Sequence, residues 1–122
     1  MRSITLLAFV AITSSAVTAC ATHRPAILAE RMLDAGSDAW GAHVDDVILG
    51  CRARALPTPA ERAACVEPTR TIDSTIVAPA IVAAVVALRA YWAAEDDDGR
   101  SRALARFARA VATLPADYWG AP

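Results

Sequence analysis

The hydrophobic residues of this chain recur mainly at steps of three and four, which is the spacing of an amphipathic helix. Residues 26–54 follow this pattern regularly, and it predicts one helix whose buried side includes Cys51. Gly36 and Ser37 weaken the middle of this helix, because Gly costs about 1 kcal/mol relative to Ala in a helix interior. A break there, with Ser37 as a new N-cap, is the alternative. The apolar stripe consists of Leu33, Gly36, Trp40, Val44, Val47 and Cys51.

A second helix has a clear start signal. Thr58 is suited to cap it, Pro59 takes the first helical position, and Glu61 completes a capping box with Thr58. This helix carries Cys65 and is predicted to end before Pro68, because a residue that precedes proline disfavours the helical conformation.

The most apolar segment covers residues 70–94. Ile76 to Leu88 contains no polar side chain, which predicts a helix that is apolar on every face and buried at the centre of the fold. Pro79 either kinks this helix or starts it afresh, with Ser74 or Thr75 as its cap.

This apolar segment has two other interpretations. One is a membrane span, although the run reaches about 19 residues only if Arg89 is included, and a span needs roughly 20. The other is an exposed surface that a partner or a second copy of the chain covers.

A last helix is predicted over residues 100–114, with Leu104, Phe107, Val111 and Leu114 on its apolar face. The acidic run from Glu95 to Asp98 is interpreted as the solvated end of the preceding helix, capped by Gly99.

Arginines form a row on the last helix. Arg102, Arg106 and Arg109 lie on one side of it and predict a solvent-exposed face, with attraction to anionic lipid headgroups as the alternative. Beyond Pro115, Tyr118 and Trp119 either pack back on the helices or form an exposed docking patch.

The first twenty residues carry the most specific motif. Arg2 precedes an apolar run from Ile4 to Val17. Even the longer stretch from Ile4 to Ala19, at about 16 residues, is short for a membrane span. The run ends in Val17-Thr18-Ala19-Cys20, which resembles the lipobox of bacterial lipoproteins. The resemblance implies that signal peptidase II removes residues 1–19 after Cys20 has received a diacylglyceryl group. The alternative is ordinary secretion, with cleavage after Ala21 by the general signal peptidase.

Lipidation of Cys20 would leave Cys51 and Cys65 as an even pair in an oxidising compartment, which predicts a disulfide between them. The alternative is two unpaired, buried cysteines.

The helical patterns together predict an all-α fold: a small antiparallel bundle of three or four helices with one disulfide. Residues 20–25 are expected to form a short tether, and residues 26–122 a single domain.

Charge and motifs narrow the range of functions. The chain has a net charge of −1, all of its basic side chains except the two His are Arg, and no basic cluster favours a nucleic-acid partner. His43 and Asp46 could supply half of a metal site, but no second half is visible. No catalytic, cofactor-binding or metal-binding motif is present, so we predict no enzymatic role, no cofactor and no metal.

We therefore expect a non-enzymatic, lipid-anchored envelope protein that binds or scaffolds a protein partner near the membrane. Ala21 is not the Asp that signals inner-membrane retention in lipoproteins, so the resemblance implies the outer membrane, facing the periplasm. The alternative is a periplasmic or secreted carrier of a small apolar ligand, with a pocket beside Trp40, Tyr91 and Trp92.

Overall fold

Four α-helices and two short helical turns make up the part of the chain that the structure, a computed structural model, describes: residues 22–120. They are α2 (Arg24–Ala53), α3 (Pro59–Ile72), the π-turn η1 (Asp73–Val77), α4 (Ala78–Ala93), α5 (Asp97–Val111) and the 3₁₀ turn η2 (Ala116–Trp119). No strand occurs among these residues, so the all-α prediction is confirmed. The predicted signal peptide and Cys20 lie outside the described residues.

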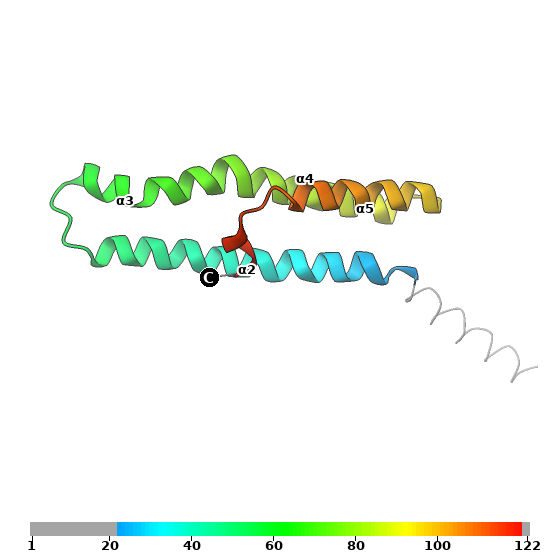
Figure 1. Ribbon diagram of the computed structural model, residues 1–122, viewed down its shortest axis with the longest axis horizontal. Helices are drawn as coiled ribbons and strands as arrows, with labels where there is room; N and C mark the ends of the chain where they lie inside the picture. Colours follow the sequence, from blue (N-terminus) through cyan, green and yellow to red (C-terminus); the bar gives the residue numbers. More distant parts are fainter. Residues whose placement is uncertain (1–21, 121–122) are drawn as a thin grey trace, which may run out of the picture.

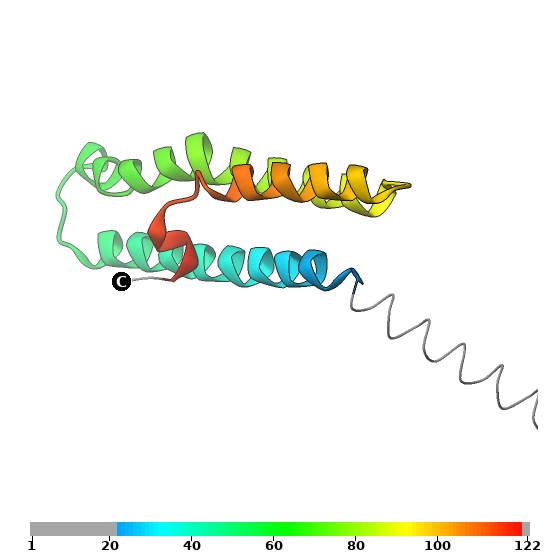
Figure 2. The ribbon, with the colours of Figure 1, turned by 45° about the vertical axis from the view of Figure 1, so that its right-hand side comes forward.

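The helices form two elongated layers, with α2 in one and α3, η1, α4 and α5 in the other (Figures 1 and 2). α2 runs along one side, α3, η1 and α4 return along the other side as a single rod, and α5 folds back beside α4 (Figures 1 and 2). η2 then crosses from the end of α5 to the surface of α2. α2 begins at Arg24, so the last two residues of the predicted tether, Arg24 and Pro25, lie within this helix.

One predicted helix end and one alternative helix break are absent from the described structure. α2 continues through Gly36 and Ser37, and the second helix continues past Pro68, so the predicted stop before Pro68 is wrong. Val66, before Pro68, is buried, and Ile72, after it, packs against the main core. This packing on both sides favours a continuous rod and outweighs the one backbone hydrogen bond that proline removes. The wider π-turn lies immediately before α4, where Pro79 occupies an early position that needs no N–H donor.

The helix starts differ in how well the sequence predicted them. The Thr58 cap is confirmed, because its Oγ1 accepts a hydrogen bond from the Glu61 N–H at 3.2 Å. Ser74 and Thr75 are not caps but lie inside the rod, where both hydroxyls donate to the carbonyl of Thr71.

The acidic run caps the start of α5 instead of ending α4, which corrects the assignment of Gly99 as a C-terminal cap. Asp96 accepts a hydrogen bond from the Gly99 N–H at 2.6 Å, and Gly99 lies in the first turn of α5. Asp97 and Asp98 lie in the same turn, where their charges favour the helix macrodipole. Asp97 Oδ1 also lies 3.6 Å from Arg100 Nη1.

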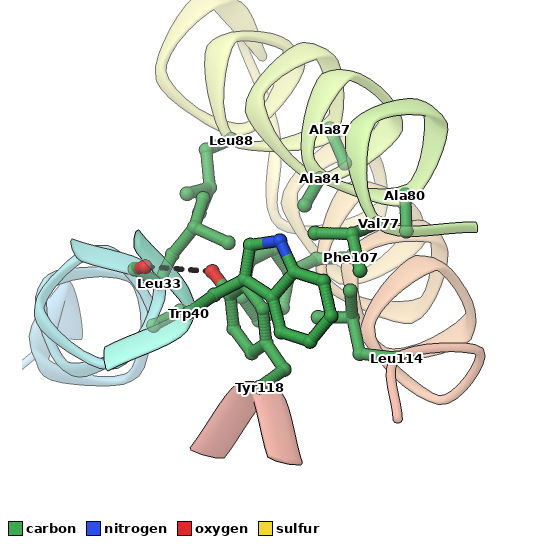
Figure 3. Close-up of a cluster of buried hydrophobic side chains, with 11 residues drawn as sticks. Leu33, Trp40, Val77, Ala80, Ala84, Ala87, Leu88, Phe107, Leu114 and Tyr118 are labelled. Carbon is green, nitrogen blue, oxygen red and sulfur yellow. Dashed lines mark hydrogen bonds between the residues drawn. The ribbon is translucent and has the colours of Figure 1, made fainter. Parts of the chain in front are cut away.

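Two large aromatic side chains fill the space between α2 and the α4–α5 pair. Trp40 projects from α2 and Tyr118 from η2, and both meet a face of α4 that consists mainly of small residues (Figure 3). Trp40 Nε1 donates to Asp73 Oδ1 at 2.8 Å, which satisfies its polar atom. Small side chains on α4 leave room for these rings: Ala80, Ala84 and Ala87.

Tyr118 is held in a notch on α2. Its side chain is fully buried, and its hydroxyl donates to the Leu33 carbonyl at 2.9 Å and lies 2.9 Å from Ser37 Oγ. A Cβ atom at Gly36 would lie 2.8 Å from Cζ and 2.9 Å from Cδ1 of the Tyr118 ring, and closer still to Cε1. Gly36 is therefore the position where η2 can approach the backbone of α2. Trp119 is more than one-third exposed and packs edge-on against Tyr118.

The predicted disulfide joins the end of α2 to α3. Cys51 and Cys65 are bonded, with their Cα atoms 5.8 Å apart, and Cys51 is buried as its place in the apolar stripe predicted. The bond closes the loop of residues 54–58, which has little core of its own.

We expect Gly36→Ala to destabilise the fold by about 1–3 kcal/mol, because the added methyl group collides with the Tyr118 ring. Gly41→Ala is the matched control. Gly41 lies in the same helix with nothing near its Cβ position, so this change should stabilise by up to about 1 kcal/mol. Urea unfolding of both variants measures the difference. In a Tyr118→Ala background Gly36→Ala should lose its penalty, and a persisting penalty would contradict the steric explanation.

Cys65→Ser should lower the free energy of unfolding by about 3 kcal/mol, since the bond closes a loop of roughly 15 residues. For a domain of this size that loss corresponds to a fall in Tm of about 10 °C or more. Thermal melts with and without reductant provide the measurement. Reductant should lower the Tm of the unsubstituted protein and leave the variant unchanged, and equal melts throughout would show that the bond does not stabilise the fold.

Candidate functional site

The outer face of α4 is apolar and uncovered. The inner face of this helix packs against α2 and α5, while Pro79, Val82, Ala83 and Val86 lie outside this packed face and are exposed. Val82 is 63% and Val86 57% exposed. The prediction that α4 is buried on all sides is therefore wrong. The reason is that α2, α5 and η2 cover only the inner face, and no described element lies on the other.

The continuous rod over Pro59–Ala93 is long and apolar enough to cross a membrane by length and composition. A core helix of a water-soluble protein can meet the same criterion, but such a helix is mostly buried. Here only 28% of the most apolar 18-residue stretch is buried within the described structure. This exposure is compatible with two of the interpretations of the sequence: a membrane span, and a surface that a partner or a second copy of the chain covers.

A groove between α4 and α5 adjoins this face. Its volume is about 440 Å³, and its floor consists of Ala83, Val86, Ala87 and Ala110. Arg106 and Arg109 complete its lining, and both are exposed, as the sequence predicted for this row of arginines. An apolar strip with guanidinium groups along one edge fits a surface that is apolar at its centre and acidic at its margin.

A cluster of rings fastens the start of α2 to the end of α4. His23 Nδ1 lies 2.9 Å from the Tyr91 hydroxyl, and the His23 ring packs against Tyr91 and Trp92. Trp92 Nε1 donates to Glu30 Oε1 at 2.6 Å, so a second bond joins the same two helices. His23, which was expected to lie in the short tether, is therefore held against α4.

The three aromatic residues proposed for a ligand pocket do not come together. Trp40 belongs to the main core, and Tyr91 to a smaller buried cluster near the start of α2. Trp92 is nearly half exposed and borders a hollow of about 250 Å³ whose lining includes neither Trp40 nor Tyr91. The three rings therefore do not line one common pocket, because periodicity within helices does not reveal where along the fold two helices meet.

His43 stacks on Trp40, with ring centroids 5.2 Å apart, and serves packing there. Within residues 22–120, no three His, Cys, Asp or Glu side chains lie close enough to hold a metal ion. Comparison with known proteins returned no matching family model, no matching curated protein and no matching solved structure.

Proposed function

We propose that this protein is a small antiparallel helical bundle, held at the bacterial outer membrane by a lipid on Cys20, that binds or scaffolds a protein partner in the periplasm. The exposed apolar face of α4 is the observation that carries the proposal. The role is one of binding without catalysis, cofactor or metal.

The position of His23 supports an arrangement close to the membrane. Cys20 precedes His23 by three residues, and His23 is fastened to Tyr91 at the end of α4. A lipid on Cys20 would therefore bring the α4–α5 end of the molecule nearest to the bilayer. The opposite end of α2, which has 30 residues, would lie about 45 Å farther along the helix axis.

The chemistry of the α4 face supports a protein partner. Exposed apolar surface is costly in water, and burying it against another surface is favourable by roughly 25 cal/mol per Å². Val82 and Val86 would supply the apolar centre of the contact, and Arg106 and Arg109 would favour a partner with carboxylates at the margin.

The anchor is tested by the intact mass of the protein extracted from membranes. We expect a chain that starts at Cys20 and carries the added mass of acyl groups. Cys20→Ala is the control, and it should abolish both the added mass and the retention in the membrane fraction. A chain that starts at Thr22 without lipid would contradict the anchor and favour ordinary secretion.

The partner surface is tested by photo-crosslinking in cells. A photoreactive residue in place of Val82 should give one discrete adduct, because this side chain lies at the centre of the proposed contact. Ala105, which is exposed on α5, provides the matched control position and should give no such adduct.

The adduct at position 82 should also weaken when Cys20→Ala removes the anchor, because the partner is expected near the membrane. Identical labelling at positions 82 and 105 would contradict the assignment of the α4 face. An adduct with exactly twice the mass of the chain would mean that a second copy, and not another protein, covers it.

A further inference from the structure

A second candidate site lies at the opposite end of the molecule from the α4–α5 loop. Here α2 ends and α3 begins, and a hollow of about 260 Å³ opens between the two helices. Its floor is apolar and consists of Ile48, Cys51, Ala63 and Val66. Cys51 and Val66 are buried and Ile48 is half-buried, while Ala63 and the arginines that line the hollow are exposed.

Three arginines complete the lining of this hollow. Arg52 comes from α2, while Arg62 and Arg70 come from α3, one turn before and one turn after Val66. No acidic side chain lines the hollow. None of the three guanidinium groups forms an ion pair with a residue in the described range, where the recorded pair is Arg100 with Asp97.

A local hydrogen bond orients one of the three arginines, Arg62. Arg62 Nη1 donates to the Leu56 carbonyl at 3.0 Å, which holds this side chain and leaves its other N–H groups free for a ligand. Arg54, by contrast, directs Nη1 toward Cys65 Sγ at 3.9 Å and does not line the hollow. The acidic residue nearest to the floor in sequence, Glu67, accepts a bond from Thr71 Oγ1.

The three arginines and the apolar floor together indicate which kind of ligand the hollow would bind. Guanidinium groups bind carboxylates and phosphates through paired, charge-assisted hydrogen bonds. The apolar floor between them favours a short hydrocarbon group. The hollow is smaller than the pockets of about 300–1,000 Å³ that hold drug-sized ligands, so the hydrocarbon part must be short.

The disulfide keeps this site in shape. Cys51 is part of the floor, and its partner Cys65 is adjacent to Val66, so the bond fixes the two walls relative to each other. A site that is fixed before binding loses less conformational entropy when the ligand enters.

We propose that this hollow binds a small, soluble amphipathic anion: a phosphate or carboxylate group that carries a short alkyl chain. The three arginines hold the anionic group, and Ile48, Ala63 and Val66 contact the chain. The inference does not rest on the proposed function, because the hollow and the outer face of α4 share no residue.

Calorimetric titration of the mature protein in zwitterionic nanodiscs tests the proposal, with empty nanodiscs as the blank. Hexyl phosphate and hexanoate are the probes. At least one of them should bind saturably, while inorganic phosphate and hexanol, which each lack one half of the ligand, should bind roughly tenfold more weakly or not at all. Equal binding of hexanol and both probes, or no saturable binding of either probe, would overturn the proposal.

Paired variants locate the binding. Arg52→Gln with Arg70→Gln should weaken binding by roughly tenfold or more, because two charge-assisted contacts are lost. Arg106→Gln with Arg109→Gln removes the same charge at the α4–α5 groove and should leave the affinity unchanged. An equal loss in both pairs would show a general charge effect and overturn the site.

Cys65→Ser, tested below its melting temperature, should weaken binding several-fold, because the two helices that form the walls of the hollow are no longer bonded. The variant should retain the preference for hexyl phosphate over hexanol.

Discussion

The seating of Tyr118 on α2 is the interaction on which the closed fold depends. α4 and α5 pack closely through small residues, but α2 stands farther away, and two aromatic rings fill the intervening space. Trp40 reaches across from α2, and Tyr118 enters from η2, bonds to the Leu33 carbonyl and lies over Gly36. Tyr118 therefore contributes to the main core and also fastens the last described turn to the first helix.

The second constraint is a mismatch between the apolar character of α4 and the amount of chain available to cover it. α2, α5 and η2 bury one side of this helix, and its remaining apolar side faces outward. Five arginines border two apolar surfaces of the described structure. Arg106 and Arg109 flank the exposed side of α4, while Arg52, Arg62 and Arg70 surround the hollow beside the disulfide. Each place combines apolar surface with cationic groups, yet one is an exposed helix face and the other is an open hollow between two helices.

Structural features that depend on residues within one or two helical turns could be predicted from the sequence. The Thr58 cap, the buried position of Cys51 and the exposed row of arginines on α5 all follow from the spacing of neighbouring residues. The acidic run was placed on the wrong helix, because a charge pattern alone does not distinguish the end of one helix from the start of the next. The alternative of a break at Gly36 followed from helix propensity, but a glycine is needed there because Tyr118, far away in the sequence, packs against this position.

The candidate sites were less predictable for the same reason. A helix that is apolar on every face does not reveal which face its neighbours will cover, so the exposure of Val82 and Val86 required the tertiary structure. The hollow near Arg52 joins residues of two helices across a loop, and neither helix carries a motif that identifies it.

The place of Tyr118 in the order of synthesis has a further consequence. Tyr118 follows all four α-helices along the chain, so the ribosome makes it only after every helix that it locks together. The core between α2 and α4 cannot close around this ring until α5 has already emerged. If the chain is exported as proposed above, this order would leave the core between α2 and α4 incomplete until the end of the described sequence has been made.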